Sequence, residues 1–309
     1  MLSYSQSDFS EQAYRRLEPV CEENRVLSEN SPEVSRHLAE ADCLLVETGI
    51  AVDKTMINAA PNLKYIGVFG TGCGRIDVKY SASRGITVCN TPGYSTEGVA
   101  EFAFGLILEH IREIERAKSQ ARGGNYSGFG YRGHEIKNKK FGVIGLGQIG
   151  RRIAEIASDG FGADVSYWSR NRKPDAEKTG FRYADISAVL SSSDFLSINL
   201  THVPATEKFI NADRINLIKP GAVVVHLSPT EVIDLDALEK RLKLDDITFI
   251  LDHSDELSPE EAVRLARYRN CVMYPSIACI TQEAKQTKLG LLIENVENYL
   301  NGNPSNMVD

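Results

Sequence analysis

Short runs of apolar residues alternate with segments of helical periodicity along most of the chain. In the first hundred residues, three such runs end in Gly, Thr or Pro, at residues 42–49, 63–72 and 85–93. Five more follow residue 140, at 141–147, 163–170, 194–200, 221–227 and 247–253. Buried strands separated by helices are typical of parallel sheets, so the pattern predicts an α/β protein with a doubly wound sheet in its second half.

Two longer segments have apolar positions at helical spacing. The first covers residues 97–122 and predicts a single helix of about seven turns that divides the chain into two lobes. The second covers residues 281–302 and predicts a helix that ends with Gly302 as its cap.

Length, charge and cysteine content narrow the possible functions. At roughly 150 residues per domain, 309 residues suggest about two domains. The net charge is -7 and no basic run could follow a phosphate backbone, so no nucleic acid partner is expected. No apolar run approaches the roughly 20 residues of a membrane helix, and the first twenty residues do not resemble a signal peptide. We therefore expect a cytoplasmic protein with no membrane partner, whose six cysteines are buried thiols rather than disulfides.

A G-x-G-x-x-G motif occupies residues 145–150, between a predicted strand and a predicted helix. In this context, the three glycines allow a tight turn, a close approach to a pyrophosphate, and packing of the helix on the strand. The N-terminus of the helix offers N–H groups and the positive end of its dipole to the phosphates. The alternative is a glycine turn that binds nothing. We expect a dinucleotide to bind here through Gly145, Gly147, Gln148, Ile149 and Gly150.

Twenty residues after this motif, the chain lacks the carboxylate that reads the ribose of NAD. It has instead the sequence Ser169-Arg170-Asn171-Arg172-Lys173. A carboxylate would repel a 2′-phosphate, whereas two arginines and a lysine beside a serine would bind one. The segment favours NADP(H) as the cofactor and leaves NAD(H) possible, with a solvated basic turn as the alternative interpretation.

Nearly the whole sequence resembles the D-isomer-specific 2-hydroxyacid dehydrogenases, a group that includes the glyoxylate/hydroxypyruvate reductases. The resemblance rests on GVFGTGCGRID, RGITVCNTPG, GVAEFAFGLIL, KFGVIGLGQIGRRIA, SDFLSINL, LIKPGAVVV, VIDLDAL and YPSIACIT. It implies two Rossmann-like domains with doubly wound parallel sheets. The NAD(P)-binding domain, residues 99–281, would be inserted into a flavodoxin-like substrate domain formed by residues 1–98 and 282–309.

The resemblance also implies roles for single residues. Backbone N–H groups of Thr71 and Gly72 would contact the substrate carboxylate, and Asp252 would contact the nicotinamide amide. The other cofactor contacts that it implies are His202, Pro204, Thr206 and Leu227. Because the family commonly forms dimers through the long helix after the substrate domain, residues 97–122 are the expected interface of a homodimer.

Three catalytic positions of the family are different in this chain. Pro229 stands where an arginine grips the substrate, and proline has neither a charge nor a donor. Ser276 stands where the acid/base histidine follows a proline, and a hydroxyl cannot carry a proton at neutral pH as an imidazole does. The glutamate that orients this histidine is replaced by Leu257, with Glu256 one position short. The ordinary reaction is not expected, because the lost proton transfer alone costs a factor of about 10² to 10⁴.

Three histidines follow predicted strands, where ligands of open α/β sheets bind: His202, His226 and His253. One of them could replace the lost imidazole, with Asp255 or Glu256 as its carboxylate partner. The nearby hydrogen-bond donors are Ser228, Tyr274 and Ser276. A structural role is the alternative for each histidine, and nothing in their spacing requires a metal. The expected catalytic residues are His253, His226 and Ser276.

Two functions therefore stay open. The first is an NADP(H)-dependent oxidoreductase with an altered active site and a non-standard substrate. The second is a catalytically inactive family member that binds NADP(H) as a sensor, regulator or scaffold. The histidines favour the first, because a decayed site has no need of new ionisable groups. Hydride transfer without a proton relay, as in formate oxidation, is less favoured because that chemistry also uses the lost cation.

Overall fold

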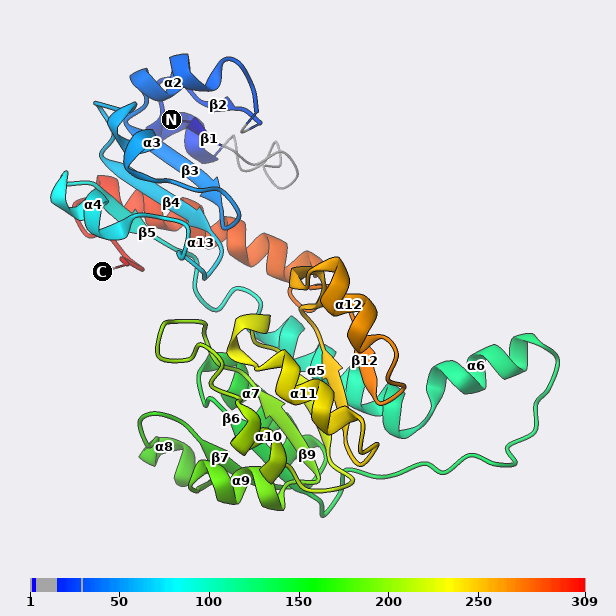
Figure 1. The fold of residues 1–309 in the computed structure, drawn as a ribbon. Helices are drawn as coiled ribbons and strands as arrows, with labels where there is room; N and C mark the ends of the chain where they lie inside the picture. The colour runs from blue at the N-terminus through cyan, green and yellow to red at the C-terminus, as the bar shows by residue number, and fades with distance from the viewer. Residues whose placement is uncertain (1, 4–15, 29, 309) are drawn as a thin grey trace. The chain divides into compact units, whose positions relative to one another are not determined.

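The structure is a computed structural model that describes residues 2–3, 16–28 and 30–308. The N-terminal segment used in the signal-peptide argument lies mostly outside the described residues. The chain divides into two compact units. Unit 1 contains residues 1–95 and 280–309, and unit 2 contains residues 96–279. Each contains a parallel sheet covered by helices, so the predicted α/β class with two Rossmann-like units is confirmed (Figure 1).

Unit 1 has a five-stranded parallel sheet in the order β2-β1-β3-β4-β5, which is the flavodoxin-like order. Its strands are β1 (Leu2–Ser3), β2 (Arg25–Val26), β3 (Cys43–Glu47), β4 (Tyr65–Phe69) and β5 (Thr87–Cys89). Its helices are the 3-10 helix η1 (Glu18–Val20), α2 (Val34–Glu40), α3 (Lys54–Asn58), α4 (Val78–Ser83) and α13 (Gln282–Leu300).

Alternate residues of β4 face the two layers of helices. Ile66 packs with Ile57 of α3 on one face, and Phe69 packs with Leu292 of α13 on the other. The C-terminal helix thus completes the core of the unit that the N-terminal half begins. It ends at Leu300, followed by Gly302 with φ +76°, as the sequence predicts.

Unit 2 has a seven-stranded parallel sheet in the order β12-β11-β10-β9-β6-β7-β8. The first strand in sequence, β6, lies between β7 and β9, so the chain winds outwards in both directions from that point. The strands are β6 (Lys140–Ile144), β7 (Asp164–Trp168), β8 (Arg182–Tyr183), β9 (Phe195–Ile198), β10 (Val223–His226), β11 (Thr248–Leu251) and β12 (Cys271–Met273). The two edge strands, β8 and β12, are absent from the sequence-based prediction.

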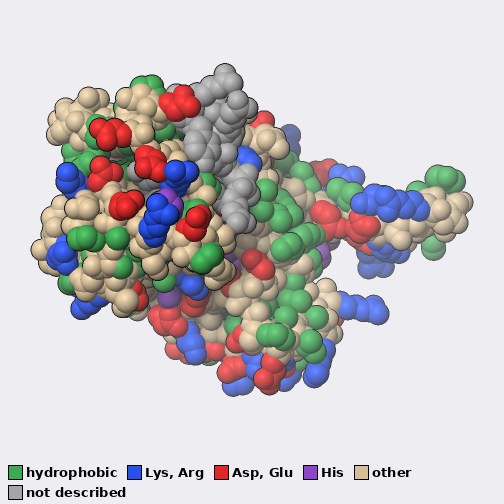
Figure 2. All heavy atoms as spheres, turned by 90° about the horizontal axis from the view of Figure 1, so that it is seen from above, with side chains coloured by type: hydrophobic (Ala, Val, Ile, Leu, Met, Phe, Trp, Pro, Cys, Tyr) green, Lys and Arg blue, Asp and Glu red, His purple; other side chains and the backbone are tan. Residues whose placement is uncertain are grey.

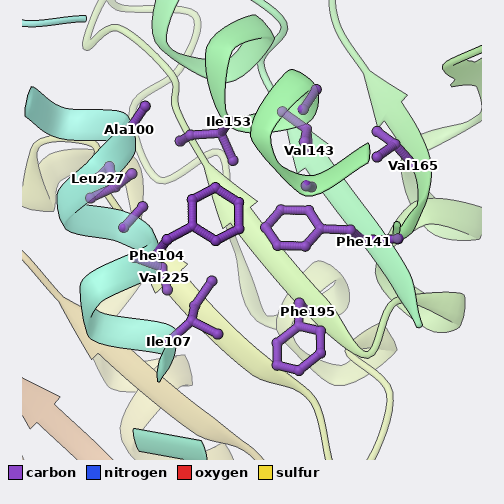
Figure 3. Packing of buried hydrophobic residues seen from close by; sticks show 14 of the residues in the cluster. Ala100, Phe104, Ile107, Phe141, Val143, Ile153, Val165, Phe195, Val225 and Leu227 are labelled. Atoms are coloured by element: carbon purple, nitrogen blue, oxygen red, sulfur yellow. The ribbon is translucent and has the colours of Figure 1, made fainter. Parts of the chain in front are cut away.

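Helices cover both faces of this sheet. On one face, Phe104 of α5 stacks on Phe141 of β6 with ring centroids 5.7 Å apart, within a cluster that includes Ile153 of α7 (Figure 3). The other face packs against α9, α10 and α11. The helical elements are α5 (Thr96–Ile111), α6 (Ile114–Arg122), α7 (Gln148–Glu155), the π-helix η2 (Ile156–Gly160), α8 (Pro174–Glu177), α9 (Ile186–Ser192), α10 (Ala212–Leu217), η3 (Thr230–Val232), α11 (Leu235–Leu242), η4 (Ser254–Glu256) and α12 (Pro259–Leu265).

The predicted helix over residues 97–122 is not continuous, so that prediction is wrong. The helix breaks after Ile111 because Glu113 adopts a left-handed backbone conformation with φ +51°. The Glu113 carboxylate pairs with Arg116 and accepts a hydrogen bond from the N–H of Arg132, which holds this turn in place. Beyond the break, α6 contains no buried residue. Figure 1 shows α6 and the loop after it extending away from the rest of unit 2.

Candidate active site

The G-x-G-x-x-G turn lies between β6 and α7, at the carboxyl edge of the unit 2 sheet. Gly145 has φ +91°, which favours glycine, and a Cβ there would lie 2.5 Å from the Asn199 carbonyl oxygen. A Cβ on Gly150 would lie 2.1 Å from the Gly145 carbonyl oxygen, so the helix can pack on the strand only without a side chain. Gly147 begins α7 without a side-chain cap, followed by Gln148 and Ile149. The open helix N-terminus suits a pyrophosphate.

The basic segment after β7 is partly used in internal contacts. Arg172 donates from Nε to Glu177 Oε1 at 2.6 Å, and its guanidinium lies over the ring of Tyr183. The buried Ser169 hydroxyl donates to the carbonyl of Asn171 at 2.6 Å. Arg170 is exposed and forms no ion pair with any residue that the structure describes. Of the two arginines, Arg170 is therefore the one available to a 2′-phosphate.

The turn after β9 has its own internal contacts. Thr206 Oγ1 accepts a hydrogen bond from the N–H of Val203 and donates to the carbonyl of Thr201 at 2.7 Å. His202 pairs with Glu207, with 2.7 Å between Nε2 and Oε2. Pro204 is exposed in the same turn. His202 thus has a partner of its own, and neither of the other two strand-end histidines contacts it among the described interactions.

His226 lies inside the sheet rather than on its accessible edge. The side chain is fully buried, its ring is 5.9 Å from that of Phe249, and Nε2 lies 3.4 Å from the Pro229 carbonyl. Burial lowers the pKa of His226 to about 4, so the imidazole is neutral at neutral pH. The expected role of His226 as a proton donor is not supported. The neighbouring Leu227 is also buried.

His253 lies among acidic side chains at the ends of β11 and β12. Its Nδ1 donates to Glu256 Oε1 at 3.0 Å, and its Nε2 faces Asp252 Oδ2 at 3.7 Å. Ser276 Oγ lies 3.1 Å from Nδ1 and donates to Asp255 Oδ1 at 2.6 Å. The structure thus brings His253 and Ser276 together, although they are 23 residues apart in sequence.

Glu256 connects this histidine to the loop after β10. Its Oε2 accepts a hydrogen bond from the N–H of Thr230 at 2.9 Å, while Oε1 contacts His253. The 3-10 turn η4 directs Glu256 to the imidazole and turns Leu257 into the core, where it is 9% exposed. The glutamate that is one position short in the sequence is therefore the one that orients an imidazole. The sequence left Asp255 and Glu256 open as the carboxylate partner of a strand-end histidine, and Glu256 is the one that contacts His253 Nδ1.

The electrostatics of the cluster keep His253 protonated over a wider pH range. Burial would lower the pKa of His253, but the hydrogen bond to Glu256 and the charges of Glu256, Asp252 and Asp255 raise it above its ordinary value. For Asp252, burial raises the pKa to about 6. Hydrogen bonds from His253 and from the N–H of Thr230 outweigh burial at Glu256 and lower its pKa. A cationic imidazole held by an ionised carboxylate can act as a proton donor.

Asp252 also has an unused acceptor. The side chain is 3% exposed, and its Oδ1 has no hydrogen-bond partner among the described residues. A buried acceptor without a partner costs free energy unless a ligand satisfies it. An amide N–H₂ group such as that of nicotinamide would do so. This acceptor and the phosphate turn together fit a nicotinamide dinucleotide at the edge of the sheet.

Thr71 and Gly72 follow β4 at the carboxyl edge of the unit 1 sheet, and both are exposed. The Thr71 carbonyl accepts a hydrogen bond from Asn90 Nδ2 at 2.8 Å, and the Thr71 hydroxyl donates to the Thr91 carbonyl at 3.4 Å. The loop is therefore fixed through its acceptors and its hydroxyl. Within the described residues, no group of three or more His, Cys, Asp or Glu side chains has an arrangement that could hold a metal ion.

Comparisons with known proteins identify the family. Residues 104–278 match the model of the D-isomer specific 2-hydroxyacid dehydrogenase NAD binding domain. A glyoxylate reductase from Thermococcus litoralis is 35% identical over 280 residues, which cover 87% of this chain and 84% of that protein. This chain belongs to the D-isomer-specific 2-hydroxyacid dehydrogenase family. It is accordingly related to NAD(P)-dependent oxidoreductases, and residues 104–278 match their NAD-binding domain.

Solved structures of related proteins agree with this assignment. An acyclic imino acid reductase in complex with NADPH and D-Arg has a TM-score of 0.87 and 28% identity, covering 100% of this chain and 99% of that one. A D-lactate dehydrogenase from Aquifex aeolicus, with NAD and lactic acid, has a TM-score of 0.85 and 22% identity, covering 98% and 95%. The second likeness supports the fold alone. No described helix of this D-2-hydroxyacid dehydrogenase family member is long and apolar enough to cross a membrane.

Proposed function

We propose that this chain is an NADP(H)-dependent reductase in which His253 has replaced the usual acid/base histidine of the family. The observation that carries the proposal is the Glu256–His253–Ser276 contact at the carboxyl ends of β11 and β12. The bound cofactor would supply the hydride. His253 Nε2, opposite the nitrogen that donates to Glu256, would deliver the proton. Residues 96–279 would hold the cofactor, and unit 1 would hold the substrate through Thr71 and Gly72.

The substrate that this cluster favours is a carbon–nitrogen double bond rather than a ketone. Hydride transfer to a ketone places negative charge on oxygen. The family stabilises this charge with an arginine, and this chain has Pro229 at that position. Asp252, Asp255 and Glu256 surround a single imidazole and favour a cation instead. Proton transfer from His253 to the imine nitrogen would give such a cation, and hydride addition to its carbon would then leave a neutral amine that needs no oxyanion donor. The related acyclic imino acid reductase supports this choice.

NADP(H) is the cofactor that the segment after β7 favours. Arg170 would pair with the 2′-phosphate, while Arg172 holds Glu177 and shapes the turn. The cofactor contacts expected in the glycine turn, and at Ser169, Asn171, His202, Pro204, Thr206 and Leu227, are part of this proposal. Because no cysteine forms a disulfide among the described residues, a reducing compartment such as the cytoplasm suits the protein.

Two copies of the chain would associate through residues 97–122 and the loop that follows. In α6 no residue is buried, while Ile114 is 47%, Tyr126 84% and Phe129 93% exposed. Figure 2 shows hydrophobic side chains at the end of this projecting segment. Large apolar side chains at the end of a projecting arm suit burial against a second copy.

The experiment that tests the function follows NADPH oxidation with 2-oxo acids, with and without ammonium or methylamine to form the imine. We expect turnover to require the amine. Equal rates without the amine would overturn the choice of imine and leave a 2-oxo acid reductase. Fluorescence titration of NADPH and NADH then measures cofactor binding independently.

The second candidate is the catalytically inactive member, which the losses at Pro229 and Ser276 favour. It predicts tight NADPH binding without turnover of any imine, 2-oxo acid or aldehyde. That outcome would exclude the proposal of a reductase and support an inactive family member. Absence of any dinucleotide binding would remove both candidates.

A further inference from the structure

Lys288 of α13 lies at the end of β4, over two aromatic rings. Its Nζ is 5.8 Å from the ring centroid of Phe69 and 5.5 Å from that of Tyr94. The packing of α13 on the sheet explains this position. A Cβ on Gly67 would lie 3.1 Å from Leu292, so the helix closely approaches β4 there. Lys288 lies one helical turn before Leu292 in α13, and Phe69 lies two residues after Gly67 in β4. The two side chains therefore meet at the carboxyl end of the strand.

The loop that starts immediately after Phe69 has the form of an anion site. The carbonyl oxygen of Gly70 accepts from the N–H of Thr91 at 3.0 Å, and that of Thr71 accepts from Asn90. The backbone N–H groups of Thr71 and Gly72 have no acceptor among the described residues, and both residues are exposed. Successive exposed N–H groups without an acceptor are the feature that anion-binding backbone loops use.

We propose that Lys288 joins the N–H groups of Thr71 and Gly72 at the carboxylate subsite that the family resemblance implies, and that it supplies the positive charge that the family obtains from an arginine at the position of Pro229. The inference deepens the proposed function, on which it rests, by adding a charged side chain of α13 to that subsite. A lysine on a flexible stem can leave the ring faces for an anion, because a charge-assisted hydrogen bond is stronger than a partly exposed cation–π contact. Nothing in the sequence pattern of α13 indicates this role.

The direct test measures binding of oxamate, an unreactive analogue of a 2-oxo acid, by calorimetry with the NADPH-loaded protein. Lys288→Met should weaken oxamate binding about tenfold or more, and Lys288→Arg should retain most of it. The neutral amide oxamide should not distinguish the variants. In turnover, Lys288→Met should raise KM with kcat nearly unchanged, because the lost contact is to a group that does not react.

A matched control is available in the same unit. Lys54 of α3 lies 5.5 Å from the ring centroid of Tyr80, a similar cation–π pair, but α3 packs on the opposite face of the sheet from α13. Lys54→Met should leave oxamate affinity and KM unchanged.

Oxamate affinity that is equal in Lys288→Met and the parent, or no oxamate binding by the parent, would overturn the subsite. These outcomes are separate from failure of the proposed function. Oxamate binding can be measured without turnover. If the protein is inactive but Lys288→Met weakens its oxamate binding, the subsite proposal stands and the proposed reductase activity is excluded.

Discussion

The glycine turn after β6 and the loops after β11 and β12 lie on the same edge of one sheet, but they are built differently. The turn offers backbone N–H groups. Its glycines cannot carry a side chain, because a Cβ would lie 2.1 Å from the nearest carbonyl oxygen at Gly150 and 2.5 Å from it at Gly145. The loops use side chains, such as those of His253 and Ser276, held by hydrogen bonds to neighbouring carboxylates. A site made from backbone cannot change without disturbing the fold, whereas a site made from side chains can be rewritten on the same scaffold.

The largest expected effect is at the rewritten loops. His253→Asn should lower kcat by about 10² to 10⁴, since it removes the proposed proton donor. His134→Asn, at an exposed histidine before β6, is the control and should leave kcat unchanged. Unchanged turnover in His253→Asn would exclude His253 from the mechanism.

The pH dependence of turnover is a second test of the role of His253. Because the carboxylates of Glu256, Asp252 and Asp255 raise the pKa of His253 against the effect of burial, reduction should slow as pH rises through that raised pKa. Glu256→Gln should move this descending limb to lower pH, since it removes the carboxylate that stabilises the imidazolium. A limb at the same pH in both proteins would show that another group titrates.

The glycine turn should respond through the fold. Gly150→Ala places a methyl group against the Gly145 carbonyl, and it should cost about 3 kcal/mol of stability and about a hundredfold in NADPH affinity. Gly147→Ala is the matched variant, because a Cβ there meets nothing within 4 Å. Gly147→Ala should have the melting temperature of the parent protein and should lose only NADPH affinity. Equal melting temperatures for both variants would contradict the steric argument.

Asp252→Asn should stabilise the protein at neutral pH. With the pKa of Asp252 raised to about 6, the folded state holds a proton that the unfolded state has released, so stability falls as pH rises from about 4 to 6. The neutral variant lacks this loss and should gain on the order of 2 kcal/mol above pH 6, measured by denaturant unfolding across pH. A gain that persists at pH 3 would point to another cause.

The smallest effect concerns cofactor choice. Arg170→Ala should weaken NADPH binding about tenfold and leave NADH binding unchanged, because only NADPH carries the 2′-phosphate. Arg182→Ala, which removes an exposed arginine paired with Asp164, is the control. Equal losses for the two cofactors would place Arg170 outside phosphate recognition.

Much of the fold was predictable from sequence, because long apolar runs and glycine turns report local constraints. The strands β3 to β7 and β9 to β11 fall within predicted runs, except that β6 begins one residue earlier, at Lys140. The two-residue β1, β2 and β8 are too short for a detectable pattern, and β12, although as long as β5, lacks the glycine turn that follows β5. The break at Glu113 depends on contacts with Arg116 and Arg132, and the latter is 19 residues away.

The candidate site was only partly predictable. The sequence places His226 and His253 alike at strand ends, but one is buried with a lowered pKa and the other lies among carboxylates. Counting from Asp252 could not show that η4 directs Glu256 to the imidazole. Lys288 carried no signal, because its proposed role depends on the packing of the C-terminal helix α13 against β4. These are tertiary effects, which a linear pattern does not record.

The 3.1 Å contact between Ser276 and His253 bears on how the site was rewritten. The resemblance to the family places Ser276 at the position of its acid/base histidine, so a chain with histidine at both 253 and 276 would carry two neighbouring imidazoles. Either could then serve while the other changed. In such a chain, the role of proton donor would change place without the site losing its imidazole, and Ser276→His makes that form.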